Sequence, residues 1–202
     1  VAPAGTSPAT HYVALQGAFA GLSGTGFSDT LTAGNNSTIR AGAGADRLAV
    51  KAGTVGASVF GGADDDLLTV TGTGIASLNF GGDSGNDLLV NQGTISGLTF
   101  SGGADQDLLQ NLGTINSTLN FGGDSGADLL ANAGTIAGLV FSGGADQDLL
   151  VNNGSVATTL HFGGDQELLL SDAGSITSLN FGGDSGNDIF VNLGSISSLI
   201  FT

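Results

Sequence analysis

Pairs of aspartates recur at glycine-rich turns along this chain of 202 residues. When the turns are aligned, the first acids of the pairs are Asp64, Asp83, Asp105, Asp124, Asp146, Asp165 and Asp184. The second acids are Asp46, Asp66, Asp87, Asp107, Asp128, Asp148 and Asp188. Carboxylates are hard oxygen ligands, and Ca²⁺ takes six to eight such oxygens. The chemistry to which this pattern points is therefore cation binding.

Stacking these turns brings like charges together. At a strand spacing of about 4.8 Å, neighbouring carboxylates repel by ~1 kcal/mol per pair even in water. Two interpretations offset that repulsion. In one, the aspartates accept hydrogen bonds from the glycine turns. In the other, Ca²⁺ is the cofactor, and its ligands are Asp64, Asp66, Asp83, Asp87, Asp105, Asp107, Asp124, Asp128, Asp146, Asp148, Asp184 and Asp188. The sequence leaves both open.

The charge balance narrows the classes of partner. The chain carries 18 acidic residues against 3 lysines and arginines, a formal net charge of −15. Nucleic acids and anionic membrane surfaces require a basic patch, so neither is expected as a partner. There is no cysteine for a disulfide or a thiolate metal site. No apolar run is long enough for a membrane helix, and we expect no membrane insertion.

Catalysis is not expected either. The cationic side chains are confined to Arg40, Arg47 and Lys51. Paired carboxylates serve glycosidases, but a catalytic pair is normally singular, whereas these pairs recur in nearly every turn. We therefore predict that the protein is not an enzyme.

The turns belong to a repeat. It closes on phenylalanine at Phe60, Phe80, Phe100, Phe121, Phe141, Phe162, Phe181 and Phe201. A fixed period near 20 residues with glycine turns is typical of a solenoid. The segments between glycines are short and rich in Leu, Ile, Val, Thr and Phe, and residues 94–96 alternate between polar and apolar, as strands do. The sequence predicts an all-β parallel β-helix over residues 28–202, with about 20 residues per rung and about eight to nine rungs.

Residues 1–27 do not follow the repeat. We expect them to form an N-terminal cap over the first rung, or an arm that adds a strand to a neighbouring molecule. The opening Val-Ala-Pro-Ala would suit the mature side of a removed signal peptide.

Stacked rungs place equivalent residues in columns. The phenylalanines are predicted to form one core column. A second contains Val55, Ile75, Ile95, Ile115, Ile136, Val156, Ile176 and Ile196. A third contains Leu48, Leu68, Leu89, Leu109, Leu130, Leu150, Leu170 and Phe190. A polar column of Asn91, Asn111, Asn132, Asn152 and Asn192, with Asp172 in the intervening rung, is expected to bond from rung to rung.

One further apolar column is predicted to point outward. It contains Leu67, Leu88, Leu108, Leu129, Leu149, Leu169 and Ile189. A continuous aliphatic stripe exceeds what a monomer usually exposes, which predicts self-association into a homo-oligomer or homopolymer. The alternative is a different register, or a corner that buries both leucine columns.

Two family resemblances follow from these motifs. Residues 61–68 (GGADDDLL) and 102–109 (GGADQDLL) resemble the calcium-binding nonapeptide of RTX proteins. The phrase at residues 84–95, 104–115 and 125–136 is similar to repeats in passenger regions of autotransporters and other large bacterial surface proteins. These resemblances imply calcium in the turns and a secreted β-helix displayed at a cell surface.

Together, these observations predict a non-enzymatic extracellular structural protein. It would assemble into a filament or surface layer, or form the stalk of an adhesin, with calcium as a stabilising ion. The alternative is a calcium-binding RTX-like module, or a surface adhesin that binds a host or glycan partner.

Overall fold

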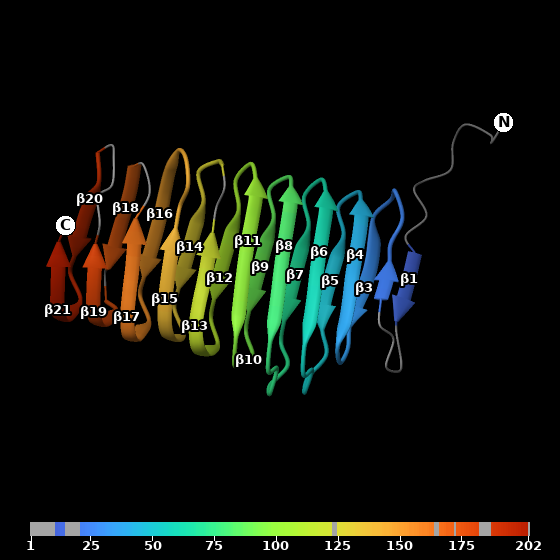
Figure 1. Ribbon diagram of the computed structural model, residues 1–202, viewed down its shortest axis with the longest axis horizontal. Helices are drawn as coiled ribbons and strands as arrows, with labels where there is room; N and C mark the ends of the chain where they lie inside the picture. Colours follow the sequence, from blue (N-terminus) through green and yellow to red (C-terminus); the bar gives the residue numbers. More distant parts are fainter. Residues whose placement is uncertain are drawn as a thin grey trace.

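The computed structural model describes residues 11–14, 21–122, 125–163, 166–171, 173–181 and 187–201. The chain winds as a parallel β-solenoid of about eight turns, with successive rungs about 20 residues apart (Figure 1). The described residues form strands and no helices, so none of them forms a helix that would span a membrane. The predicted fold class is confirmed.

Each rung gives one strand to each of two parallel sheets. The ten-stranded sheet contains β1 (His11–Ala14), β3 (Asp29–Ala33), β5 (Arg47–Val50), β7 (Leu67–Val70), β9 (Leu88–Asn91), β12 (Leu108–Asn111), β14 (Leu129–Asn132), β16 (Gln147–Asn152), β18 (Gln166–Ser171) and β20 (Ile189–Asn192). The eleven-stranded sheet contains β2 (Gly21–Ser23), β4 (Ser37–Ala43), β6 (Ala57–Ala63), β8 (Leu78–Ser84), β10 (Thr94–Ile95), β11 (Leu98–Ala104), β13 (Thr114–Gly122), β15 (Thr135–Ser142), β17 (Ser155–Gly163), β19 (Ser175–Phe181) and β21 (Ser195–Phe201). Strands β1 and β2, which precede the repeat, pair with β3 and β4 and extend both sheets.

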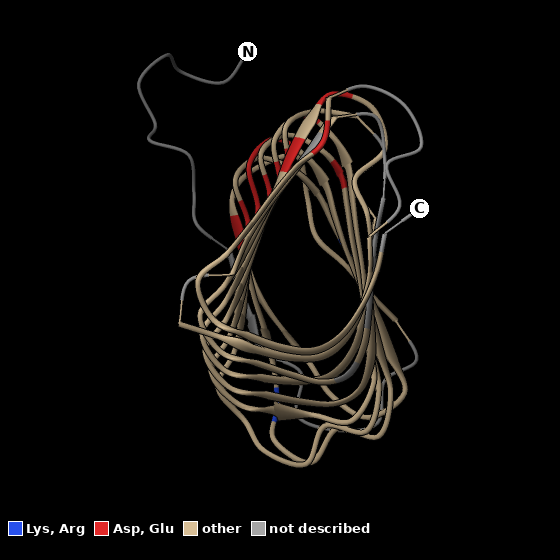
Figure 2. Ribbon diagram, turned by 90° about the vertical axis from the view of Figure 1, so that its left-hand side faces the viewer, with Lys and Arg blue, Asp and Glu red and all other residues tan. Residues whose placement is uncertain are grey.

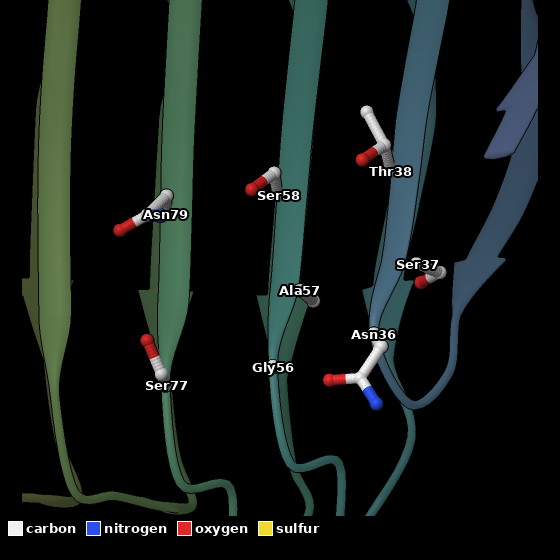
Figure 3. A pocket seen from close by; sticks show the side chains of 8 residues that line it. All are labelled: Asn36, Ser37, Thr38, Gly56, Ala57, Ser58, Ser77 and Asn79. Carbon is white, nitrogen blue, oxygen red and sulfur yellow. The ribbon is translucent and has the colours of Figure 1, made fainter. Parts of the chain in front are cut away.

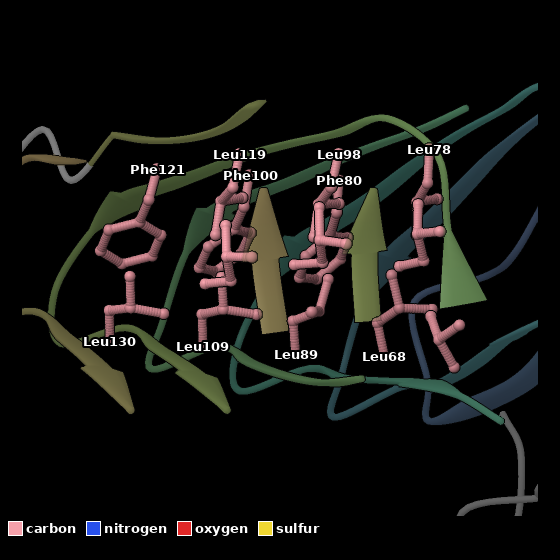
Figure 4. Close-up of a cluster of buried hydrophobic side chains, with 14 of the residues drawn as sticks. Leu68, Leu78, Phe80, Leu89, Leu98, Phe100, Leu109, Leu119, Phe121 and Leu130 are labelled. Atoms are coloured by element: carbon pink, nitrogen blue, oxygen red, sulfur yellow. The ribbon is translucent and has the colours of Figure 1, made fainter. Parts of the chain in front are cut away.

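The core lies between the two sheets (Figure 4). Because side chains alternate across a strand, the strands from β7 to β18 of the ten-stranded sheet turn their second leucine inward, as Leu89 and Leu109 show. Phenylalanines from the other sheet stack above them. The ring centroids of Phe80 and Phe100 lie 5.2 Å apart, and those of Phe100 and Phe121 lie 5.0 Å apart.

Phe60 was predicted to belong to this ring ladder, and that prediction is wrong. Val59 is the residue that pairs with Phe80, and it is fully buried. Phe60 points outward, where the guanidinium of Arg40 lies 5.3 Å from its ring centroid. The connection from β7 to β8 is one residue longer than that from β5 to β6, so equal spacing in sequence puts Phe60 and Phe80 on opposite faces.

The predicted core position of Val55 is also wrong. Its side chain is 58% exposed, whereas the neighbouring Thr54 is buried. The Thr54 hydroxyl donates a hydrogen bond of 2.6 Å to the carbonyl oxygen of Lys51. This bond satisfies the hydroxyl at an apolar position of the rung.

The short repeat around β18 shifts three further predictions by one residue. Leu169 pairs with Leu150 and is fully buried, so its predicted place in the outer column is wrong. Leu168 takes that outward position, and Leu170 leaves the core for the outer face. The residue opposite Asn152 is Ser171 and not Asp172, which lies outside the described residues.

The asparagine column forms the predicted ladder from Asn91 to Asn152, whereas Asn192 donates its amide to the Gly194 carbonyl oxygen of its own turn. Asn91, Asn111 and Asn132 each donate a side-chain amide hydrogen bond of 2.8 Å to the carbonyl oxygen of the next asparagine. The ladder stops at Ser171. Within the described part of the chain, the Asn152 Nδ2 and Ser171 Oγ atoms are buried without a hydrogen-bond partner. Since unpaired buried polar atoms are costly, the β18 rung is a weak point of the stack.

Candidate functional site

The acidic residues gather along one edge of the solenoid, where the eleven-stranded sheet turns into the ten-stranded sheet (Figure 2). Each turn follows a strand such as β6 and ends immediately before the next strand, such as β7. Parallel stacking repeats this turn in every rung, so the acids lie on one side of the molecule. The arrangement confirms that the acids stack at a common edge.

The outer acids do not form the single column that the alignment predicts. The five turns at residues 42–44, 62–64, 83–85, 103–105 and 144–146 each contain two residues in the left-handed region, and aspartate takes a different one in neighbouring rungs from Asp64 to Asp105. Asp83 pairs with Gly62 and with Gly103. The first left-handed column is Gly42, Gly62, Asp83, Gly103 and Gly144, and the second is Gly44, Asp64, Gly85, Asp105, Gly126 and Asp146. Asp124 and Asp184 lie outside the described residues.

This exchange of glycine and aspartate has an electrostatic consequence. Within one column, successive aspartates are two rungs apart, which is about 10 Å and not about 4.8 Å. Doubling the distance at least halves the repulsion between them. Left-handed backbone is open to glycine and is tolerated by aspartate better than by most residues, which is consistent with these two types at both positions.

The outer aspartates also cap the glycine turns. Asp64 accepts a hydrogen bond of 2.9 Å from the backbone N–H of Gly44, one rung below. Asp146 accepts a bond of 3.1 Å from Gly126 in the same way. The side chains of Asp64, Asp83, Asp105 and Asp146 are nonetheless exposed. Their carboxylates face solvent, as does that of Asp65, and a dissolved cation reaches them on this edge.

The inner aspartates form a buried ladder from Asp29 to Asp148, each at most 2% exposed. One carboxylate oxygen of Asp87 accepts the backbone N–H of Asp66 at 2.8 Å, and Asp107 accepts that of Asp87 at 2.8 Å. The same bond links every rung of the ladder. The inner aspartates therefore join the rungs at the beginning of the strands of the ten-stranded sheet, as the asparagines do at the end of these strands.

The second oxygen of these carboxylates is enclosed. For Asp66, Asp87 and Asp107, the Oδ2 atom is buried and has no hydrogen-bond partner among the described residues. It packs against a glycine of its own turn, and for Asp87 this is Gly82. With one oxygen bonded and the other covered, the inner carboxylates present no open face to a metal ion.

Burial changes the proton affinity of this ladder. Loss of hydration raises the pKa of Asp66 to about 7, of Asp87 to about 8 and of Asp107 to about 6. The backbone hydrogen bond lowers each pKa in part, and neighbouring aspartates raise it again. Burial likewise raises the pKa of Asp46 and of Asp148. Asp66 and Asp87 therefore hold protons near neutral pH.

The predicted calcium ligands thus divide into two environments. Asp66, Asp87, Asp107, Asp128 and Asp148 are buried and bonded to backbone, whereas Asp64, Asp83, Asp105 and Asp146 are exposed. Asp188, near the last described rung, is partly exposed. Among the described residues, no three acidic or histidine side chains are grouped so as to hold a metal ion.

The close contact at Gly82 gives a stability prediction. A methyl group there would overlap the Asp87 carboxylate and the carbonyl oxygen of Gly102. We expect Gly82→Ala to lower the free energy of unfolding by at least about 2 kcal/mol, measured by urea denaturation. Gly122→Ala is the matched control, since nothing lies within 4 Å of its added methyl group. Equal stability of the two variants would contradict the enclosed carboxylate.

The ten-stranded sheet presents the other notable surface, which we name the aliphatic face. Its first outward column is Leu67, Leu88, Leu108, Leu129, Leu149, Leu168 and Ile189. Its second is Thr69, Val90, Gln110, Ala131, Val151, Leu170 and Val191. These side chains are partly exposed, and Ile189 reaches 55%. Neither column contains a charge from β7 to β20, so seven adjacent strands form one uncharged surface.

The outer face of the eleven-stranded sheet is different. Around β4, β6 and β8 it carries hydroxyl and amide groups that line an open groove of about 240 Å³ (Figure 3). Thr38, Ser58 and Asn79 stand side by side on neighbouring strands there. The outer face of the eleven-stranded sheet is small and polar at this groove, but it also carries Phe60 and Val140. It differs from the aliphatic face in having no continuous leucine column.

Sequence reasoning missed the exchange of glycine and aspartate, although the signal was present. The phrases at residues 80–87 (FGGDSGND) and 100–107 (FSGGADQD) show it once they are aligned on phenylalanine and on the last aspartate. Comparisons of the chain with models of protein families, with curated proteins and with solved structures find no match.

Proposed function

We propose that this chain is a non-enzymatic structural protein, a β-helical scaffold that associates with further copies of itself through the aliphatic face. The observation that carries the proposal is the pair of uncharged outward columns over seven strands. Burying partly exposed leucines gains roughly 25 cal/mol per Å² of apolar surface removed from water. The contrast with the small polar side chains of the opposite face favours a dedicated contact surface.

The size of the face sets the expected strength of the contact. Seven strands at about 4.8 Å span roughly 30 Å, and four residues per strand span roughly 13 Å, or about 400 Å² per copy. Two such faces bury about 800 Å², below the roughly 1,200 Å² of stable complexes. One pair is therefore a weak, reversible contact.

The setting that we propose is extracellular, in a filament, a surface layer or an adhesin stalk. The likeness of the repeat phrase to autotransporter passenger repeats supports this setting. Acid pairs that recur with the rungs support a structural role for the carboxylates and not a catalytic one.

Sedimentation velocity across a wide concentration range tests the self-association. We expect the sedimentation coefficient to rise with concentration, and Leu108→Lys/Leu129→Lys to abolish that rise. The added lysines make the net charge of the chain less negative, so stronger repulsion between the net charges of two copies would not explain the loss. Thr99→Lys/Ser101→Lys on the opposite face is the charge-matched control. A wild-type protein that stays monomeric throughout would refute the proposal.

A second candidate function is calcium binding at the acidic edge. The exposed carboxylates of Asp64, Asp83, Asp105 and Asp146 favour it. A cation that binds only the folded chain stabilises it by about 2.7 kcal/mol at one hundred times its Kd. We expect calorimetric heat on adding Ca²⁺, and a higher Tm that chelator reverses. Asp64→Asn/Asp105→Asn should reduce both effects, whereas absence of heat and of a Tm shift at millimolar Ca²⁺ would exclude this function.

A further inference from the structure

We infer that the aliphatic face pairs with the same face of a second copy that runs in the same direction, about a two-fold axis along the solenoid. The inference rests on the proposed self-association and adds its geometry. A two-fold pair can also be built with the copies running in opposite directions, about an axis parallel to the strands and perpendicular to the solenoid. Two features of the molecule distinguish these arrangements.

The first feature is the charge on the two borders of the face. On one border lies the acidic edge, with two acids in nearly every turn. The other border is formed by the connections that lead from each strand of the ten-stranded sheet to the next strand of the eleven-stranded sheet. From β7 onward, these connections contain a single acid in the sequence, Asp172, which lies outside the described residues. This second border includes Gln92, Leu112, Ala133, Asn153 and Leu193.

The direction of the second copy decides which borders meet. An axis along the solenoid places each acidic edge against the uncharged border of the other copy. The two acidic edges are then separated by the width of the face, which exceeds the screening length of about 8 Å at physiological salt. An axis parallel to the strands places acidic edge against acidic edge along the full length. For chains with a formal net charge of −15, only the first arrangement avoids that repulsion.

The second feature is the size of the facing side chains. When both copies run in the same direction, the leucine column of one lies over the second column of the other. Leu129 of one copy then faces Ala131 of the other. A shallow groove of about 180 Å³ runs beside Ala131, lined in part by Gln110, Leu112 and Val151. It receives the leucine, whereas copies in opposite directions set leucine against leucine.

The spacing along the face suits a second copy. Both columns repeat at the strand spacing of about 4.8 Å, so the two copies stay in register along the face. The first column then lies over side chains smaller than leucine in five of the seven rungs, at Thr69, Val90, Ala131, Val151 and Val191. Flat stacked sheets with identical side chains form dry, interdigitated contacts of this kind. The second copy supplies a surface with the same repeat and the same length.

Crosslinking of single cysteines tests the direction, because the native chain has no cysteine. Val90 on β9 and Leu170 on β18 both lie in the second outward column, at equal distances from β14 at the centre of the face. They are four rungs apart, or about 19 Å. Each would be replaced by cysteine alone, and a bismaleimide that spans about two rungs would be added at concentrations where sedimentation shows association.

If the copies run in the same direction, Val90→Cys links to itself and Leu170→Cys links to itself. A mixture of the two, one labelled with ¹⁵N to separate the products by mass, gives no mixed link. Mixed links between the two variants with little self-linking would show opposite directions and overturn the inference. Thr99→Cys, on the polar face, measures linking by chance collision and is expected to stay monomeric.

The outcomes separate this inference from the proposed function. Concentration-dependent sedimentation without links above the Thr99→Cys level would show that another surface mediates association, and the inference would be wrong. Absence of any concentration dependence would refute the proposed self-association and the inference together. If each cysteine variant links to itself and these links disappear in the Leu108→Lys/Leu129→Lys background, the result supports the proposed self-association and the inferred direction.

Discussion

Lowering the pH from 8 to 5 is expected to raise the Tm of this protein by about 5 °C or more. The cause is the buried ladder of inner aspartates, in which burial raises the pKa of Asp66 to about 7 and of Asp87 to about 8. Most proteins lose stability in acid because their carboxylates are ionised and paired in the folded state. Here the folded state favours the protonated carboxyl groups.

The sign follows from proton binding in the two states. In the unfolded chain these aspartates titrate near their ordinary value of 3.8, whereas the folded ladder titrates between about 6 and 8. Between these limits the folded state binds more protons, so stability falls as the pH rises. One pKa unit corresponds to about 1.4 kcal/mol, which is about 3–6 °C in Tm for a chain of this length.

Two aspartate-to-asparagine variants assign the effect to the ladder. Asp87→Asn keeps an oxygen that accepts the Asp66 N–H and removes a buried charge, so its Tm should depend less on pH. Asp105→Asn removes an exposed charge, and asparagine tolerates the left-handed backbone there. It should keep the wild-type dependence. A Tm that falls on acidification would contradict the assigned ladder, and Tm measured by circular dichroism at several pH values decides it.

Replacing Phe100 by alanine is expected to lower the free energy of unfolding by about 3–5 kcal/mol. Its ring is 1% exposed and stacks between those of Phe80 and Phe121. In a solenoid, each rung is stabilised by its two neighbours, so a cavity in a central rung weakens both of its interfaces. Urea denaturation monitored by circular dichroism measures the loss.

Phe60→Ala is the matched control. Phe60 ends the same repeat phrase, but its ring lies on the outer surface of the solenoid beside Arg40. Removing it should cost less than about 1 kcal/mol, the range of exposed cation–π contacts. If Phe60→Ala were as destabilising as Phe100→Ala, the outward position of Phe60 would be refuted.

The regular part of this fold was predictable because one physical pattern repeats. Glycine turns about 20 residues apart and inward residues such as Leu89, Phe100 and Asn111 define the rung without reference to any other protein. The errors occur where one connection gains or loses a residue. At Phe60, Val55 and Leu169 the spacing in sequence stays near 20 while the strand register changes, and a shift of one residue reverses the face of a strand.

The candidate site was less predictable for a different reason. Sequence spacing placed the acids at one edge, but it did not show that Asp87 is buried while Asp83 is exposed. That difference depends on which residues adopt left-handed backbone and on the contact between Gly82 and the Asp87 carboxylate. The outward leucines were predicted in six of the seven rungs, since alternation along a strand follows directly from the sequence.

The alternation of glycine and aspartate at the two left-handed positions makes the two-rung block the modular unit of this rod. Deleting one rung, such as that of β11 and β12, would set Asp83 and Asp124 in neighbouring rungs, both at the first of these positions in the sequence pattern. Deleting two rungs restores the alternation. The electrostatic cost of changing the length of the rod is therefore lowest for steps of about 41 residues. This is the distance in sequence between the two copies of the phrase FSGGADQD, at residues 100–107 and 141–148. Engineered lengths should follow the same step.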